Sequence, residues 1–201
     1  MRRPAGRPPP GCRLVIPTDR QIRALHERFA PNHAAFELVH THCEIVCALA
    51  EELYTGGDLE LVRAGCLLHD IGVYRLNETD SYLRHGVLGH ELLRELGLPE
   101  QLSRFCSHHT GVGITRDDVI TLGLPLPPGD YLAETTEEEL VMYADKFHSK
   151  TSPPVFVTAD SYAVSLSRFG AGKVARFAEL RDRYGEPNLD AAAKRFGHAV
   201  V

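Results

Sequence analysis

Apolar residues recur every three to four positions along most of the chain, which is the spacing that predicts helices. The clearest example covers residues 34–54, and the pair Gly56-Gly57 ends it. Its apolar face consists of Phe36, Val39, Cys43, Val46, Cys47, Ala50 and Leu53. No segment sustains the strict alternation that is typical of a half-buried strand. The pattern therefore predicts an all-α protein, a helical bundle in which a sheet is not expected.

Capping and breaking residues give the bounds of the other predicted helices. Thr18 can cap the first helix, and Pro31 stops it because the residue before a proline disfavours helical geometry. Asp58 can cap the helix that runs into the pair His69-Asp70. We predict helices over residues 18–30, 34–54, 58–70, 85–96, 99–109, 137–148, 160–169 and 171–184.

The remaining segments have less regular patterns. Residues 73–84 are polar and predict a loop, and residues 111–135 predict one short helix followed by a proline-rich loop. Thr136 and Glu139 have the spacing of a capping box and introduce the helix that follows. After Pro187 we expect only a short tail.

Composition limits the class of protein. With 201 residues, 43% of them hydrophobic, the chain has room for one domain with a substantial core. The net charge of −5 argues against a dedicated nucleic-acid surface, which would normally be basic. The basic, proline-rich residues 1–11 lack the apolar run of a signal peptide, and no apolar run is long enough to cross a membrane. Five cysteines without zinc-finger spacing indicate reduced thiols and a cytoplasmic protein.

Histidine is unusually frequent, with eleven residues. Several of them, and two aspartates, stand on separate predicted helices, most often where a helix begins or ends. The candidate metal ligands are His42, His69, Asp70, His85, His109 and Asp145. The core of a helical bundle can gather such side chains into one metal site. Imidazole and carboxylate ligands suit divalent iron, manganese, zinc, cobalt or nickel, so the residue types do not select the metal.

Five stretches that follow one another in the chain carry a family resemblance. They are HCEIVCALAEEL, GCLLHDIG, RHGVLGHELLRELGLP, HHTGVGIT and TEEELVMYADK. Together they resemble the HD-domain superfamily of metal-dependent phosphohydrolases, in particular its small prokaryotic HDIG-type members. The resemblance covers about residues 36–146. It implies an HD-domain helical bundle, which we place over residues 18–150. The composition and the helix pattern predict a disordered or extended tail (1–17) before this domain and a helical extension (151–201) packed on it.

The resemblance also implies two groups of metal ligands that share one carboxylate. These are His42, His69, Asp70 and Asp145 for one ion, and Asp70, His85 and His109 for a second. Asp70 would bridge the two ions, as in the dinuclear branch of the superfamily.

Some of these assignments have simpler alternatives. His42 could be a core histidine, His85 a residue that merely starts a helix, and Asp145 a surface acid. His109 is preferred to its neighbour His108 because the segment TGVGIT that follows it matches the family. Six further histidines are expected to be structural or exposed: His26, His33, His40, His90, His148 and His198.

The function that the resemblance implies is hydrolysis of a phosphate ester of a nucleotide or another small phosphorylated metabolite. Asp70 would bridge two divalent ions that activate a hydroxide for attack on phosphorus. We expect His108 to protonate the leaving group. Lys146, Arg75 and Arg84 are expected to contact the phosphate because each flanks a ligand or the loop beside it, and Lys146 is also a catalytic candidate.

Two other functions are compatible with the same residues. One is a di-iron oxygenase, since some members of the superfamily use this ligand set with iron. The other is a non-catalytic metal-binding sensor or scaffold. Val73 follows HDIG, and no GYP triplet follows, so a cyclic-dinucleotide phosphodiesterase of the HD-GYP kind has no support. The sequence identifies neither the substrate nor the oligomeric state.

Overall fold

The structure is a computed structural model that describes residues 15–201. Its α-helices are α1 (Asp19–Phe29), α2 (His33–Leu53), α3 (Leu59–Leu68), α4 (His85–Glu95), α5 (Glu100–Ser107), α6 (Arg116–Thr121), α7 (Thr136–Ala144), α8 (Ala159–Leu166), α9 (Ala171–Tyr184) and α10 (Leu189–Phe196). Short 3-10 helices are η1 (Ile71–Arg75), η2 (Tyr82–Arg84), η3 (Asp145–Phe147) and η4 (Ser167–Phe169). The strands are β1 (His148–Ser149), β2 (Val155–Phe156) and β3 (Ala199–Val200). The predicted all-α class is confirmed.

Side-chain caps begin the first and third helices as predicted. The Thr18 hydroxyl accepts the Gln21 N–H at 3.4 Å, and Gln21 Oε1 accepts the Thr18 N–H at 2.8 Å, which together form a capping box. Asp58 accepts the Leu61 N–H at 3.1 Å and caps α3. These local contacts fix where the two helices start.

The start of α7 differs from the prediction by one residue. Thr135, not Thr136, caps the helix, and its hydroxyl accepts the Glu138 N–H at 3.2 Å. Thr135 has the extended backbone that a cap requires, whereas Thr136 is already helical. The helix also ends at Ala144, before the predicted His148, because the chain tightens into η3.

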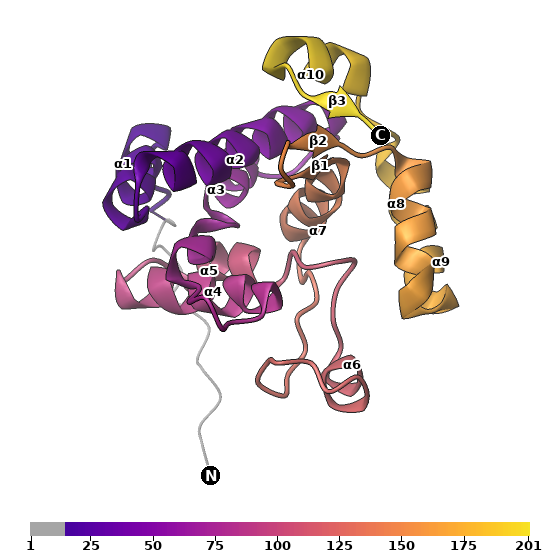
Figure 1. Ribbon diagram of the computed structural model, residues 1–201, viewed down its shortest axis with the longest axis horizontal. Helices are drawn as coiled ribbons and strands as arrows, with labels where there is room; N and C mark the ends of the chain where they lie inside the picture. Colours follow the sequence, from indigo (N-terminus) through magenta and orange to yellow (C-terminus); the bar gives the residue numbers. More distant parts are fainter. Residues whose placement is uncertain (1–14) are drawn as a thin grey trace.

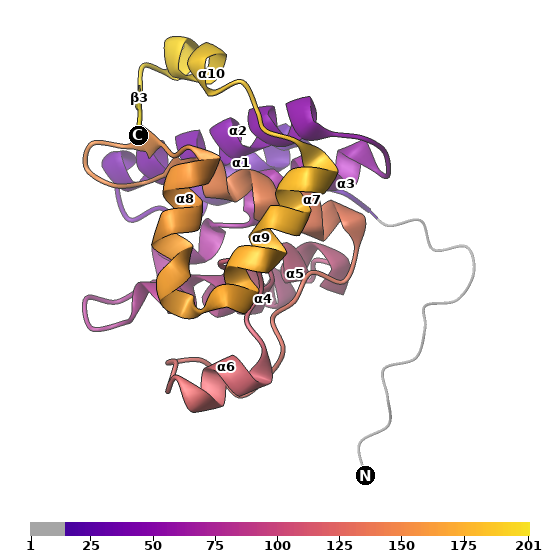
Figure 2. The same cartoon turned by 90° about the vertical axis from the view of Figure 1, so that its right-hand side faces the viewer.

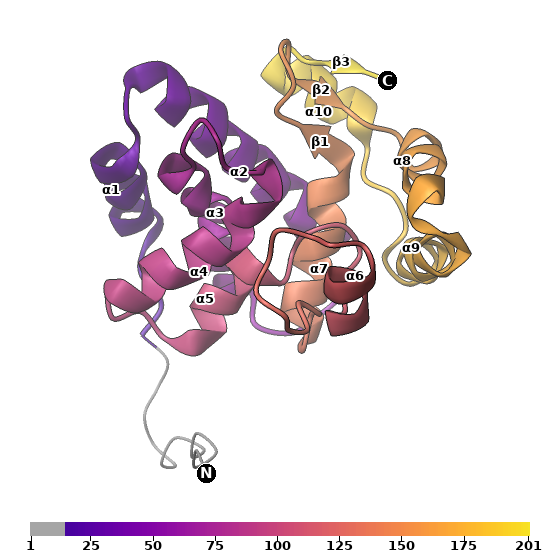
Figure 3. The same cartoon turned by 60° about the horizontal axis from the view of Figure 1, so that its bottom comes forward.

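Helix α2 is the longest, and it packs against α3 and α7, which also contact each other (Figure 1). Helix α4 packs against α5 and η1, and α5 joins this pair to α3. Figure 3 places α8, α9 and α10 on the side of the bundle opposite α1. Phe177 and Leu180 of α9 are buried in the same core as Leu68 of α3 and Tyr143 of α7. The segment after residue 150 therefore shares the core of the helices that precede it.

Residues 110–135 leave the bundle, carry α6 at their tip and return to α7 (Figures 1 and 2). The predicted short helix is thus present. Ile114 and Tyr131 close the base of this excursion through two backbone hydrogen bonds of 3.0 and 2.8 Å. Lys173 of α9 ties it to the C-terminal helices through an ion pair with Asp118 at 2.6 Å.

A small sheet joins the C-terminal part to the bundle. Strand β1 pairs antiparallel with β2, and β2 pairs parallel with β3. The expectation of no sheet was wrong here, because two-residue strands are too short to show alternation. The short tail predicted after Pro187 was also wrong, since Asn188 caps α10 by accepting the Ala191 N–H at 3.0 Å. The predicted loop at 73–84 contains the end of η1 and the whole of η2.

The segments η1 and α4 cross in backbone contact at Gly72. A Cβ atom at this position would overlap the carbonyl oxygen of His85 and the backbone of Gly89. Glycine is therefore required for the chain after Asp70 to lie directly on the first turn of α4. This contact brings the end of α3 close to the start of α4.

Part of the predicted N-terminal tail, residues 1–14, lies outside the described residues, as does Cys12. The other cysteines are buried and free, as predicted: Cys43, Cys47, Cys66 and Cys106. None of the helices within residues 15–201 combines the length and hydropathy that a membrane span requires.

Candidate metal centre

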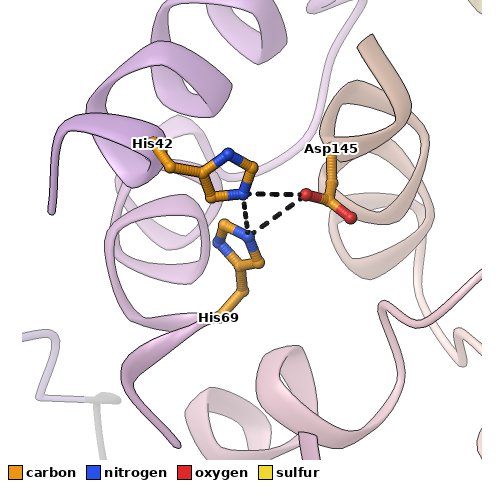
Figure 4. A group of neighbouring side chains, drawn as sticks. All are labelled: His42, His69 and Asp145. Atoms are coloured by element: carbon orange, nitrogen blue, oxygen red, sulfur yellow. Dashed lines mark hydrogen bonds and ion pairs between the residues drawn. The ribbon is translucent and has the colours of Figure 1, made fainter. Parts of the chain in front are cut away.

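The six predicted ligand side chains come from separate elements and converge inside the bundle. They are His42 within α2, His69 and Asp70 directly after α3, His85 at the start of α4, His109 just beyond α5 and Asp145 directly after α7. Five are buried, and the side chain of Asp145 is 14% exposed. Figure 4 shows His42, His69 and Asp145 pointing toward one another. Ends of α3, α4, α5 and α7 that meet beside the middle of α2 thus bring together residues far apart in the sequence.

One group of donor atoms lies between α2, α3 and α7. His42 Nε2 is 3.2 Å from His69 Nε2 and 3.0 Å from Asp145 Oδ1, and His69 Nε2 is 3.4 Å from the same oxygen. Asp70 Oδ2 completes the group at 3.3 Å from His42 Nε2. Ligand bonds of about 2.0–2.1 Å to one ion would separate neighbouring donors by roughly 3.0–3.4 Å. The spacing therefore fits a metal ion held by two imidazoles and two carboxylates.

The other oxygen of Asp70 faces a second group. Asp70 Oδ1 is 3.2 Å from His85 Nε2 and 3.6 Å from His109 Nε2, and these two nitrogens are 2.9 Å apart. Oδ1 is buried and has no hydrogen-bond partner among the described residues, although buried polar atoms are nearly always paired. A cation bound at this oxygen would satisfy it. Asp70 thus stands between two donor groups, with one oxygen toward each.

Backbone carbonyls orient three of the four imidazoles through Nδ1. The contacts are His69 to Cys66 at 2.7 Å, His85 to Tyr82 at 2.5 Å and His109 to Phe105 at 3.0 Å. A neutral imidazole that donates from Nδ1 presents a lone pair at Nε2, which is the form that binds metals. Lone pairs that face each other at about 3 Å repel unless a cation lies between them. The donor set and its orientation therefore fit divalent metal ions.

The fourth imidazole, His42, is supported by the small sheet. Nδ1 of His42 lies 2.8 Å from Nδ1 of His148, and Nε2 of His148 lies 2.9 Å from Nδ1 of His198. When His42 donates from Nδ1, His148 accepts at Nδ1 and donates from Nε2 to His198. His148 lies in β1 and His198 directly precedes β3, so the chain's C-terminal segment supports a predicted ligand.

Residues 39–150, which contain all six side chains, match the family model described as HD domain. The chain belongs to the HD-domain family. The resemblance seen in the sequence and the predicted HD-domain helical bundle are thereby confirmed.

Relatives of known name are similar to this HD-domain chain over part of their length. The uncharacterized protein MJ0778 of Methanocaldococcus jannaschii is 46% identical to it over 116 residues. This match covers 54% of this chain and 65% of that protein. The tRNA (cytidine(56)-2'-O)-methyltransferase of Picrophilus torridus is 33% identical to this chain over 163 residues. This match covers 80% of this chain and 40% of that enzyme. The chain thus spans less than two thirds of either relative.

A solved structure has the same fold. The HD domain of the L. monocytogenes phosphodiesterase PgpH superposes with a TM-score of 0.52 and 18% sequence identity. The superposition covers 90% of this chain and the whole of that domain. At this identity the likeness establishes the architecture of the HD domain and leaves its reaction to be argued from the site.

Burial favours neutral imidazoles in this HD domain. It lowers the pKa of His42 and of His85 to about 4, and it also lowers the pKa of His109. Burial opposes a charge on His69 too, but Asp70, Cys43 and Asp145 together outweigh it and raise the pKa of His69 well above its ordinary value. A proton and a metal ion would compete for the Nε2 lone pair of His69, so metal binding there would release a proton.

Two lysines after α7 contact the predicted carboxylate ligands. Lys146 is buried, and its Nζ donates to Asp145 Oδ2 at 2.7 Å and to the His109 carbonyl at 2.9 Å. Lys150 forms an ion pair with Asp70 Oδ2. Burial opposes the charge of Lys150, but Asp70 together with Tyr82 and Asp145 outweighs it, and the pKa of the ammonium is raised. The sequence predicts a role for Lys146 and gives no signal for Lys150, because the family-like stretch ends at position 146.

Two cavities with shared lining residues lie beside the candidate metal ligands. The smaller has a volume of about 250 Å³ and is lined by Asp70, His85 and His109. The larger has a volume of about 660 Å³, and its wall includes the apolar side chain of Val155 and the ring of Tyr162. The residues that line both cavities are Tyr82, Asp145, Lys146 and Lys150. A small molecule where the two cavities adjoin would therefore contact Asp145 and both lysines, and in the smaller cavity also Asp70, His85 and His109.

Two predicted phosphate contacts lie elsewhere. Arg75 forms a two-pronged ion pair with Glu95, at 2.9 and 2.5 Å, and Arg84 pairs with Asp80 at 2.5 Å. Neither arginine belongs to the described lining of either cavity. Both are close to predicted ligands in the sequence, but the 3-10 helices η1 and η2 direct their side chains to other acids.

His108 is also not brought to the predicted ligands. Its Nδ1 lies 3.5 Å from Glu138 Oε2 without forming a hydrogen bond, and Glu138 is held by Arg104 at 2.8 Å. His108 is absent from the described lining of both cavities. The geometry therefore gives no support to His108 as the acid that protonates a leaving group.

The other histidines lie at the periphery of this centre or away from it. His26 is fully buried between the Leu67 carbonyl, at 2.7 Å, and the Tyr74 hydroxyl, at 2.8 Å. His33 is exposed, and His40 is buried. Their contacts are those of structural or solvated residues.

Proposed function

We propose that this HD-domain protein is a metal-dependent phosphohydrolase that cleaves the ester of a small phosphorylated metabolite at a centre of two divalent ions. The observation that carries the proposal is the position of Asp70. Its Oδ2 faces His42 and His69, and its Oδ1, which has no hydrogen-bond partner among the described residues, faces His85 and His109. Paired ions of this kind are a recurrent solution for hydrolysis at phosphorus.

The proposed ligands of one ion are His42, His69, Asp70 and Asp145, and those of the second are Asp70, His85 and His109. Bound divalent ions supply a nucleophile from water at neutral pH and offset the charge of a phosphoryl group. The protein's own residues orient the ligands: Lys146 holds Asp145 through Oδ2, so that Oδ1 faces the imidazoles. Iron, manganese, zinc, cobalt and nickel all accept this ligand set.

The cavities favour a small ester with an apolar or aromatic part, such as a nucleotide. The larger cavity, at about 660 Å³, lies within the range of roughly 300–1,000 Å³ that holds small-molecule ligands. Tyr162 and Val155 offer apolar contact, and the hydroxyl of Ser161 offers a hydrogen bond. The methyltransferase name of one relative supports no proposal of methyl transfer, because this chain spans 40% of that enzyme.

The test is metal analysis followed by a phosphate-release screen. Protein purified without added metal is analysed for its metals, and each metal found is then used in assays on nucleoside monophosphates and sugar phosphates. Asp70→Ala should lose nearly all bound metal and all metal-dependent phosphate release. His90→Ala is the matched control, because His90 contacts Ser107 and Glu100 instead of the proposed ligands, and it should behave as the wild type.

Other outcomes would replace the hydrolase. Undiminished phosphate release by Asp70→Ala would overturn the proposal. Bound iron, oxygen consumption with an organophosphonate and no phosphate release from the phosphate esters would identify the di-iron oxygenase instead. Full metal loading without turnover of any compound would favour a metal-binding sensor.

A further inference from the structure

Lys150 is a charged side chain at the proposed metal centre, and neither the sequence nor the ligand geometry gives it a role. It directly follows β1, its side chain is 14% exposed, and it forms an ion pair with Asp70 Oδ2. Its Nζ also lies 5.9 Å from the centre of the Tyr82 ring. An ammonium group held this far inside a protein requires an anionic partner.

In a metal-loaded centre, Asp70 alone is a poor partner for Lys150. Its carboxylate charge would then be shared with cations, and those cations would repel the ammonium. Asp145 is a ligand through Oδ1 and holds Lys146 through Oδ2. The described residues that line the two cavities include no other carboxylate. Lys150 therefore needs an anion that the protein itself does not supply.

We infer that Lys150 binds the phosphoryl group of the substrate, exchanging its ion pair with Asp70 for one with the phosphate when the centre is loaded. This role rests on the proposed function, which brings a phosphoryl group to these cavities. A lysine ammonium binds phosphate as a compact charge. Pairing of β1 with β2, with His148 opposite Phe156, holds the backbone before Lys150. The exchange then requires only a movement of the lysine side chain between Asp70 and the adjoining cavities.

Two calorimetric titrations distinguish this role from a structural one. Mn²⁺ is titrated into metal-free protein, and inorganic phosphate is titrated into Mn²⁺-loaded protein. Lys150→Met should weaken phosphate binding about tenfold or more, because the phosphate loses a charged partner. The same variant should bind Mn²⁺ about tenfold more tightly, because the competing ion pair and the charge repulsion are removed. The two affinities thus change in opposite directions.

Three further variants complete the test. Lys150→Arg retains the charge and should bind phosphate within about threefold of the wild type. Lys150→Gln repeats the neutral substitution with a polar side chain should the Met variant not fold. Lys194→Met removes an exposed lysine from α10 and should change neither titration.

The inference is overturned if a neutral residue at position 150 leaves phosphate affinity unchanged. Parallel loss of phosphate and Mn²⁺ binding would also overturn it, because the lysine would then be a support for the ligands. The proposed function can fail separately. If wild-type protein binds phosphate through Lys150 yet releases none from any ester, the hydrolase is wrong and the phosphate-binding role of Lys150 stands.

Discussion

Buried histidines occur in two settings within this bundle. His26 of α1 and His69 after α3 are both fully buried, at 0% exposure. Nε2 of His26 lies 2.7 Å from the Leu67 carbonyl and Nδ1 lies 2.8 Å from the Tyr74 hydroxyl, so the ring has a partner for its donor and for its acceptor. His69 uses Nδ1 on the Cys66 carbonyl and turns Nε2 toward other imidazole nitrogens and carboxylates.

Burial by itself therefore does not identify a metal ligand. When both nitrogens of a buried imidazole have protein partners, the hydrogen-bonding groups of the ring are satisfied within the core. An imidazole whose Nε2 faces further Nε2 atoms and carboxylates needs a cation between them, either a proton or a metal ion. The contrast between His26 and His69 can be tested directly by substituting each.

The largest effect is expected at the proposed ligands. His69→Ala should lose the metal bound between α2, α3 and α7, and metal-dependent phosphate release should fall by at least about 1,000-fold. Elemental analysis and the phosphate assay measure the two losses. If this variant kept its full metal content, His69 would not be a ligand, and the difference between His69 and His26 would be wrong.

A different loss is expected at His26. In His26→Leu the Leu67 carbonyl and the Tyr74 hydroxyl lose their partner, so the free energy of unfolding should fall by about 2–3 kcal/mol. Urea unfolding of the metal-free protein measures this change. Metal stoichiometry should equal that of the wild type, and loss of metal would mean that His26 belongs functionally with the ligands.

A smaller effect is expected at the histidines that support His42. His148→Ala should weaken metal binding about tenfold, because the imidazole of His42 loses the partner of its Nδ1. His198→Ala, one hydrogen bond further away, should weaken it less. Metal titration and the visible spectrum of the Co²⁺-loaded protein report the change at the ligand. The exposed His33→Ala is the control, and an effect of equal size there would exclude a specific role for His148.

The contrast between His26 and His69 also predicts how stability depends on pH. Burial lowers the pKa of His26 to about 4 from an ordinary value of 6.5. Between these values the unfolded chain binds a proton that the folded protein excludes, so stability is full above pH 6.5 and is lost as the pH falls toward 4. Over this range metal-free wild type should lose up to about 1.4 kcal/mol per pH unit more than His26→Leu. Urea unfolding at several pH values measures both slopes, and equal slopes would contradict the lowered pKa.

The helices and the proposed ligands were accessible from the sequence because both depend on short-range patterns. Apolar spacing and capping residues such as Thr18 and Asp58 act within a few positions. The ligands occur in short stretches, and the resemblance supplied their grouping. Errors arose where local patterns were ambiguous: Thr135 and Thr136 are chemically alike, and only the backbone decides which one caps α7.

The rest of the site depends on contacts that leave no local pattern. Lys150 meets Asp70 across 80 residues, and His148 meets His42 across 106. Arg75 is close to the predicted ligands in the sequence, but in the structure its guanidinium pairs with Glu95. Packing of the folded chain decides which distant charged side chains meet. A local sequence pattern therefore does not predict these pairs.

The backbone contact at Gly72 has a consequence for how the centre could vary. It fixes the distance between the segment that carries Asp70 and the helix that begins with His85. A larger residue at position 72 would move α4 outward and draw His85 away from Asp70, while His42, which belongs to α2, would keep its place. A single methyl group at this position would therefore convert the proposed two-ion centre into a one-ion centre without altering any ligand.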